Sequence, residues 1–103
     1  MKVTFLGVGE AFDENNTHTC ILVEAAGRRM LVDCGATAPP SVWHQSKRPD
    51  YLDGIFISHF HADHVFGLPA LMMRMWEDGR TRPFYLFGPV GTQRNVERLM
   101  EVA

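Results

Sequence analysis

Residues 58–64 read SHFHADH, and the chemistry and the fold that we expect of the chain follow mainly from this short stretch. It holds three of the five histidines, together with one aspartate. In an extended backbone alternate side chains project to the same side, so His59 and His61 can point at one ion. Asp63 and His64 follow where the chain must turn, so they can approach the same region from another direction. Imidazole and carboxylate donors suit Zn²⁺, and we predict these four residues as metal ligands.

The two remaining histidines, His18 and His44, stand alone in the sequence. A lone histidine is more often a surface residue, or a core residue hydrogen-bonded to backbone carbonyls, than a metal ligand. We therefore expect neither to bind metal. The same structural explanation is weaker for residues 59–64, because three imidazoles and a carboxylate gather there at the end of one apolar run.

That apolar run is one of several expected strands. Ile55, Phe56 and Ile57 are consecutive, as in strands covered on both faces, so we expect this strand to be buried. Upstream, two short apolar runs surround Gly27, which predicts a hairpin whose second strand ends at Asp33. The expected strands span residues 2–8, 19–24, 29–33, 52–58 and 84–87.

Helices are expected at three places. Residues 41–45 can form at most one turn, because prolines flank them. A helix should begin at Leu68 with Pro69 in its first turn, and its apolar residues nearly all round predict burial. Thr92 should cap a last helix with Val96, Leu99 and Met100 on one face.

Composition restricts the class of protein. With 103 residues the chain is one domain at most, and 46% hydrophobic and 21% charged residues indicate a globular protein. The net charge of −2 provides no general attraction for nucleic acid or an anionic membrane. Three pairs of basic residues occur, and we assign them mainly to the solvated surface: Arg28 and Arg29, Lys47 and Arg48, Arg80 and Arg82.

Cys20 and Cys34 each lie inside an apolar stretch and form no CxxC pair, so we interpret them as buried free thiols. The N-terminal residues lack the apolar core of a signal peptide, and no apolar run approaches the roughly 18 residues of a membrane span. We expect a cytoplasmic protein.

The spacing of the four predicted ligands matches the HxHxDH signature of the metallo-β-lactamase superfamily, which this chain therefore resembles. Residues 5–7 (FLG) and 33–35 (DCG) are similar to early motifs of that superfamily. Residues 67–69 (GLP) and 88–91 (GPVG) most resemble its ribonuclease Z branch.

The resemblance implies an αββα sandwich, in which this chain is the N-terminal half, with a mixed β-sheet and flanking helices. It implies that His59 and His61 bind a first metal ion and that Asp63 and His64 bind a second, giving two Zn²⁺ in a complete site. Asp33 would lie beside the site and contact the ligands. The implied activity is hydrolysis by a metal-bound hydroxide, with Asp63 also transferring a proton.

The same family fold takes a further His, a bridging Asp and a last His from its second half, and no His follows His64. We therefore expect residues 1–103 to be the N-terminal part of a longer domain. Ala36 and Thr37 stand where ribonuclease Z proteins usually carry an acidic residue and a second Gly. The expected substrate is accordingly a small-molecule ester or phosphodiester, with RNA as one candidate, and no membrane partner is expected.

Two other hypotheses stay open. The chain can be a stand-alone module that holds one metal ion without turnover, or a half-sandwich whose uncovered sheet pairs with a second copy as a homo-oligomer. The metal is also open, because manganese, iron or nickel can occupy mixed His and carboxylate sites.

Overall fold

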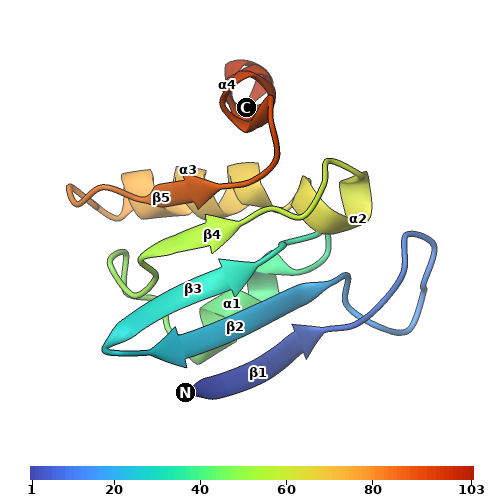
Figure 1. Ribbon diagram of the computed structural model, residues 1–103, viewed down its shortest axis with the longest axis horizontal. Coiled ribbons are helices and arrows are strands. Elements are labelled where there is room, and N and C mark those ends of the chain that lie inside the picture. The colour runs from blue at the N-terminus through green and yellow to red at the C-terminus, as the bar shows by residue number, and fades with distance from the viewer.

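The computed structural model describes residues 1–103, whose strands form one mixed five-stranded sheet in the order β1-β2-β3-β4-β5 (Figure 1). Antiparallel pairing joins β1 to β2 and β2 to β3, and parallel pairing joins β3 to β4 and β4 to β5. Because β3, β4 and β5 run the same way, their carboxyl ends meet at one edge of the sheet. The strands span Lys2–Gly7, Cys20–Ala25, Arg28–Val32, Gly54–Phe56 and Tyr85–Phe87.

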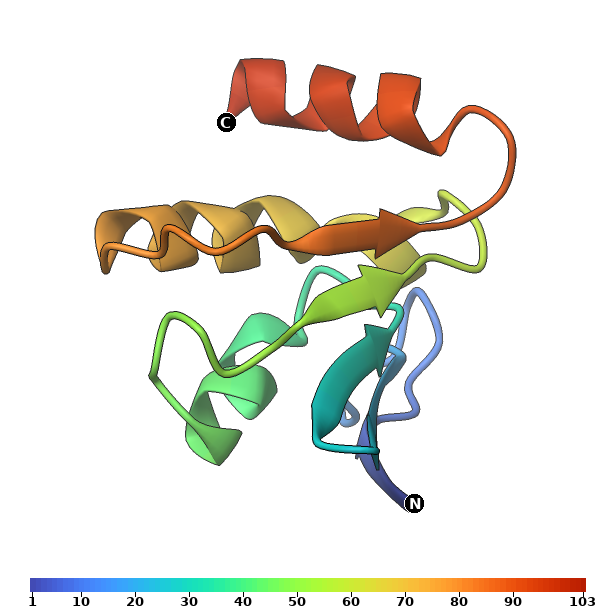
Figure 2. The same ribbon diagram turned by 60° about the vertical axis from the view of Figure 1, so that its left-hand side comes forward.

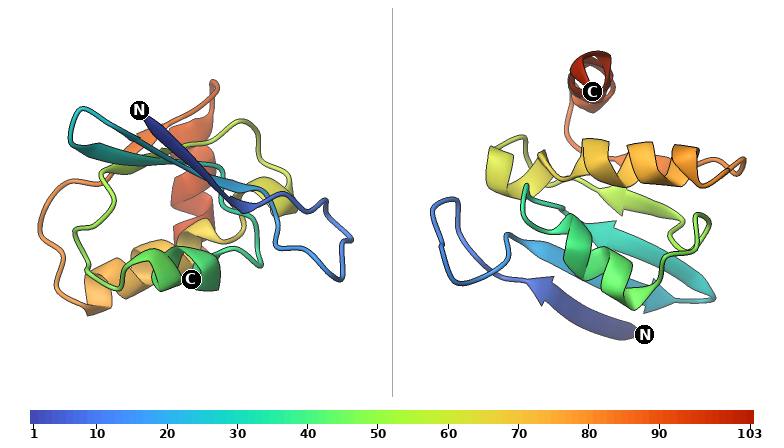
Figure 3. Two further views of the ribbon diagram at one scale, coloured as in Figure 1. Left: turned by 90° about the horizontal axis from the view of Figure 1, so that it is seen from below. Right: turned by 180° about the vertical axis from the view of Figure 1, so that it is seen from behind.

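Four helices accompany the sheet: α1 (Pro39–Gln45), α2 (Ala62–Val65), α3 (Leu68–Glu77) and α4 (Thr92–Val102). Seen from behind, α1 and α3 lie across one face of the sheet (Figure 3). The short α2 lies near the carboxyl ends of the parallel strands, and α4 lies beyond β5 (Figure 2). None of these helices is both long and apolar enough to cross a lipid bilayer.

The predicted hairpin is confirmed, and its turn has a clear local cause. Two residues, Ala26 and Gly27, separate the paired Ala25 and Arg28, and both have positive φ, 52° and 75°. Two left-handed residues in a two-residue loop match the right-handed twist of the flanking strands. Gly27 adopts this conformation without steric cost.

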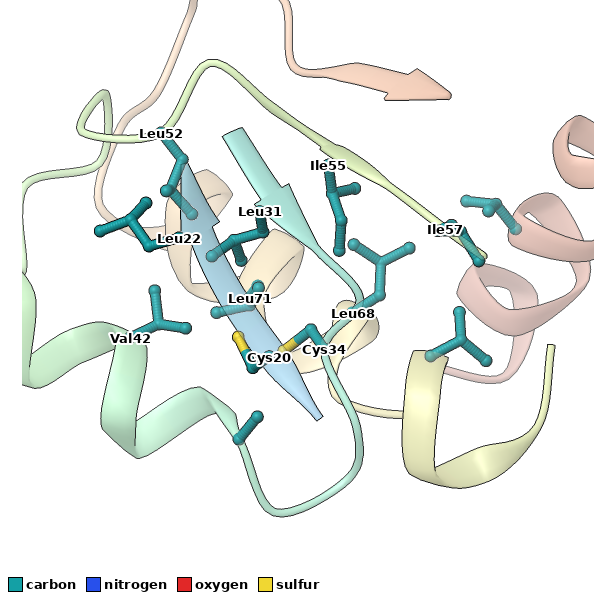
Figure 4. Close-up of a cluster of buried hydrophobic side chains, with 13 residues drawn as sticks. Cys20, Leu22, Leu31, Cys34, Val42, Leu52, Ile55, Ile57, Leu68 and Leu71 are labelled. Carbon is teal, nitrogen blue, oxygen red and sulfur yellow. The ribbon is translucent and has the colours of Figure 1, made fainter. Parts of the chain in front are cut away.

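The hydrophobic core lies between the sheet and the helices α1 and α3 (Figure 4). Leu22, Leu31 and Ile55 stand side by side on adjacent strands and are at most 1% exposed. Cys20 and Cys34 lie within this core as free thiols, as predicted. A hydrogen bond with Cys20, together with burial, raises the pKa of the Cys34 thiol, so Cys34 stays protonated and serves packing.

The opposite face of the sheet carries apolar side chains that no helix covers. The strand register places Phe5, Ile21, Val32, Phe56 and Phe87 in one row across all five strands. The three phenylalanines of this row are 66%, 47% and 52% exposed. The expectation that the strand of Phe56 is covered on both faces is therefore wrong for residues 1–103, because helices pack on one face only.

Helix boundaries also correct the sequence predictions. α1 begins at Pro39 and is longer than one turn, because prolines at the first helical positions need no backbone N–H partner. α3 buries one face only, since Trp76 is 72% exposed and Met73 is 40% exposed. Thr92 is not the cap of α4: Gly91 holds the cap position, and the Thr92 hydroxyl donates to the Pro89 carbonyl.

Arg80 does not behave as the solvated surface residue that its sequence context indicates. Its guanidinium donates to the carbonyl oxygens of Pro49 and Leu52 at 3.0 and 2.7 Å and to that of Pro83 at 2.8 Å. It also lies 5.2 Å from the centre of the Phe84 ring. One planar side chain therefore joins the segment before β4 to the segment before β5.

Replacing Arg80 by Lys should lower the free energy of unfolding by about 2 kcal/mol, because a single ammonium cannot reproduce this fork of charged hydrogen bonds. Urea denaturation measures the difference. Arg94→Lys on the exposed side of α4 is the matched control and should change stability by less than about 0.5 kcal/mol. Equal unfolding midpoints for the two variants would argue against this role of Arg80.

Candidate metal centre

The candidate centre is built where the parallel strands β3 and β4 end. Asp33 directly follows β3, and residues 57–59 follow β4, so both segments emerge at the same edge of the sheet (Figure 1). The Asp33 N–H donates to the Phe56 carbonyl at 2.9 Å, which continues the sheet by one residue. Asp33 then turns with a positive φ of 60° and directs its carboxylate toward the neighbouring loop.

The helix α2, which the sequence did not predict, returns the chain toward Asp33. His61 precedes it in an extended conformation, and the N–H groups of His64 and Val65 donate to the His61 carbonyl at 2.9 and 3.1 Å. The Cys34 N–H in turn donates to the His64 carbonyl at 2.8 Å. These bonds place Asp63 and His64 beside the end of β3.

Three imidazole rings gather at this place. The centre of the His59 ring lies 4.8 Å from that of His61 and 4.0 Å from that of His64. His59 and His61 are exposed, whereas the side chain of His64 is 20% exposed. The predicted ligands thus lie together on an accessible loop at the edge of the sheet.

Asp33 orients His64. The Asp33 side chain is 4% exposed, and its Oδ2 lies 2.7 Å from His64 Nδ1. An ionised carboxylate can only accept, so Nδ1 carries the proton and donates. In the neutral ring, Nε2 of His64 is then an acceptor, and it lies 3.3 Å from Oδ2 of Asp63.

Two acceptors that face each other at this distance repel unless a positive charge lies on or between them. The donor set Nε2 of His64 and Oδ2 of Asp63 therefore fits a divalent cation, which prefers such mixed nitrogen and oxygen ligands. A second proton on His64 would satisfy the same contact. No group of three or more His, Cys, Asp or Glu side chains is arranged as a metal site, so the residues gather without forming a closed coordination sphere.

The histidines outside the cluster are placed elsewhere. His18 is 7% exposed; its Nδ1 accepts from the Thr37 N–H at 3.4 Å, and its Nε2 lies 3.2 Å from the Ala11 carbonyl. His44 is exposed on α1. His18 is thus bonded to backbone groups, the structural role that a lone histidine usually has.

Sequence reasoning assigned no role to Ser58, which the structure places between Asp33 and His59. Its hydroxyl lies 2.5 Å from Asp33 Oδ2 and 3.0 Å from His59 Nδ1. The only signal in the sequence was its position directly before the first histidine. That position alone does not show whether the hydroxyl bridges two side chains or whether the serine is an ordinary turn residue.

The fold of this chain is the N-terminal part of a metallo-β-lactamase fold. Helices cover one face of its mixed sheet, and the cluster of His and Asp side chains lies where the parallel strands end. The chain belongs to the family described as Anti-Pycsar protein Apyc1, whose model matches residues 1–96. Ribonuclease Z relatives and solved structures with the metallo-β-lactamase fold confirm the resemblance to that superfamily.

Curated relatives support the ribonuclease Z branch. Ribonuclease Z of Methanococcus maripaludis strain C7 is 36% identical over 103 residues, which cover 99% of this chain and 33% of the relative. Ribonuclease Z of Anoxybacillus flavithermus is 35% identical over 108 residues, covering 100% of this chain and 34% of the relative. The chain spans about a third of the length of these curated relatives.

Solved structures show the same fold. The human tRNase Z, short form, superimposes with a TM-score of 0.82 at 32% identity, covering 99% of this chain and 40% of that one. The metallo-beta-lactamase fold protein YhfI from Bacillus subtilis has a TM-score of 0.78 at 22% identity, covering 93% of this chain and 39% of that one. The second comparison supports the fold alone.

Proposed function

We propose that residues 1–103 form the N-terminal part of a metallo-β-lactamase-fold domain, and that the complete protein is a metal-dependent hydrolase of phosphodiesters. The proposed ligands are His59 and His61 for one metal ion, and Asp63 and His64 for a second. Zn²⁺ is the proposed metal, because imidazole nitrogen and carboxylate oxygen are its usual non-thiolate donors. The ribonuclease Z relatives support the phosphodiester class, with RNA as a candidate substrate.

One observation carries the proposal: while Nδ1 of His64 faces Asp33, its Nε2 lies 3.3 Å from Oδ2 of Asp63, a contact that a metal ion or a second proton on the ring would satisfy. Asp33 enforces this arrangement, because it holds the proton of His64 on Nδ1. A buried carboxylate behind an imidazole is the usual way in which proteins fix the ring nitrogen that faces a metal ion. The contact is therefore arranged to receive positive charge.

A divalent metal pair would supply Lewis-acid activation of water and would stabilise charge on the leaving oxygen. The residues of this chain would orient the ligands and transfer the proton. Asp33 holds the orientation of His64, and the Asp63 carboxylate, 15% exposed, would accept a proton from the attacking water. The exposed His59 and His61 leave the centre open to a substrate.

The remaining ligands of the centre, one bridging Asp and two His in the proposal, would come from beyond residue 103. The apolar row on the uncovered sheet face fits the same proposal, because the second sheet of an αββα sandwich would bury Phe5, Phe56 and Phe87. We also propose a cytoplasmic location, where the candidate RNA substrates occur.

The test is metal-dependent hydrolysis of a model phosphodiester, bis(p-nitrophenyl) phosphate, by the complete protein. Chelation should abolish turnover and Zn²⁺ or Mn²⁺ should restore it. Asp63→Asn should keep the fold but lower kcat by about 100-fold or more, because the amide can neither accept the proton nor match the charge of the carboxylate. Asp50→Asn, an exposed aspartate in the segment before β4, is the control.

Turnover that survives chelation, or an unchanged kcat for Asp63→Asn, would refute this assignment. Metal binding without any turnover would instead favour a metal-binding module without catalysis. The uncovered apolar face also favours pairing with a second copy when no second sheet covers it, and a mass that rises with concentration would reveal this.

A further inference from the structure

The loop between β4 and α2 contains a hydrogen-bonded chain that links two predicted ligands to one carboxylate. Oδ2 of Asp33 lies 2.7 Å from Nδ1 of His64 and 2.5 Å from Oγ of Ser58. The same Ser58 Oγ lies 3.0 Å from Nδ1 of His59. His64 is therefore attached to Asp33 directly, and His59 is attached through the hydroxyl of Ser58.

The direction of each bond follows from the number of protons available. A serine hydroxyl has one proton, and Asp33, which accepts only, must receive it. The hydroxyl can then only accept from His59, so Nδ1 of His59 carries the proton of the neutral ring. The lone pair of His59 is left on Nε2, as it is in His64.

A backbone hydrogen bond also holds Asp33 against this loop, so the position of the carboxylate does not depend on the Ser58 hydroxyl. The Ser58 N–H donates to the other Asp33 oxygen, Oδ1, at 2.7 Å, so the carboxylate stays docked against the loop whatever side chain stands at position 58. Burial of Asp33, at 4% side-chain exposure, protects the hydrogen bonds that its own carboxylate accepts from competition by water, whereas the bond between Ser58 and His59 is exposed. The hydroxyl therefore adds one specific function, which is control of the proton on His59.

We infer that Ser58 is a positioning residue that fixes the ring orientation and the Nδ1–H tautomer of His59, so that Nε2 is free to bind a metal ion. The inference rests on the proposed metal site. It extends the role of Asp33 from one ligand to two, since both imidazoles depend on the same carboxylate. Without the hydroxyl, Nδ1 of His59 has no partner on Asp33, and the proton can move to Nε2, where it blocks coordination.

The experiment compares Ser58→Ala and Ser58→Thr in the complete protein, with Ser41→Ala on α1 as the control. Ring ¹⁵N chemical shifts of the metal-free protein, recorded at about pH 8.5 where imidazoles are neutral, report the tautomer of His59. Zn²⁺ affinity is measured by competition with a chromophoric chelator. Ser58→Ala should shift His59 toward the Nε2–H form and weaken Zn²⁺ binding about 10- to 100-fold, whereas Ser58→Thr should restore both.

An unchanged tautomer and an unchanged affinity in Ser58→Ala would overturn the inference. If the unaltered protein binds no Zn²⁺, the proposed function fails, but the tautomer measurement still decides the role of Ser58. Should Ser58→Ala fail to fold, Ser58→Val gives the same comparison, because its side chain fills the space and can neither hydrogen-bond nor bind Zn²⁺.

Discussion

Replacing His59 and His61 together by Ala removes tight binding of the first metal ion in the complete protein, with an expected loss in Zn²⁺ affinity at that site of about 1,000-fold or more. A structural Zn²⁺ held by four ligands contributes roughly 10 to 16 kcal/mol, so two lost ligands account for several kcal/mol. Each 1.4 kcal/mol corresponds to a tenfold change in affinity. The measurement is metal content after dialysis against a weak chelator, followed by a competition titration.

His44→Ala is the matched control, because this imidazole is exposed on α1, outside the cluster. It should retain the metal content of the unaltered protein. The double variant should also keep its folding midpoint without metal, since both replaced rings are exposed and lie outside the core. If the double variant kept as many tightly bound Zn²⁺ ions as the unaltered protein, His59 and His61 would not be ligands of the first metal ion.

Replacing Gly35 by Ala should destabilise the protein by about 3 kcal/mol, at the upper end of the usual cost of overpacking. A Cβ at this position would come within 2.2 Å of the Asp63 carbonyl oxygen and 2.3 Å of the His18 Cβ. Both neighbours are held in place, because His18 is bonded to backbone groups and α2 is tied to Cys34. The added methyl must therefore push the ligand loop away from β3.

Urea denaturation and Zn²⁺ titration together measure this effect, since the same displacement would disturb Asp63 and His64. Gly27→Asn is the control: nothing lies within 4 Å of a Cβ there, and Asn tolerates the positive φ of 75°. If Gly35→Ala unfolded at the same urea concentration as the control, the close approach of these two loops would not be required for stability.

Local patterns in the sequence were sufficient to predict several secondary-structure elements. The hairpin around Gly27, the strand that ends at Asp33 and the helix that begins at Leu68 are each encoded by nearby residues, through turn chemistry, β-branched runs and a proline at the helix start. The two buried thiols could be predicted for the same reason, because each cysteine lies within an apolar run. The HxHxDH spacing indicated which side chains should gather.

Other features depend on partners distant in the sequence and could not be predicted. Arg80 reads as a surface residue, yet its guanidinium joins carbonyl groups about 30 residues upstream. The strand of Phe56 was expected to be covered on both faces, yet helices cover only one face of it within residues 1–103, and Phe56 is exposed. α2 is too short to leave a periodic pattern, and it forms because its backbone is tied to His61 and Cys34.

The identity of the candidate donors and the positions along the chain of the strands that lead to them follow from the sequence alone, because both are properties of residue type and local spacing. Which nitrogen of His59 and of His64 faces a hydrogen-bond partner could be learned only from the folded chain. That choice depends on Asp33 and Ser58, which are 25 residues apart in the chain and meet where two parallel strands end. Hydrogen bonds of this kind are set by distance and direction in space, which spacing along the chain does not encode.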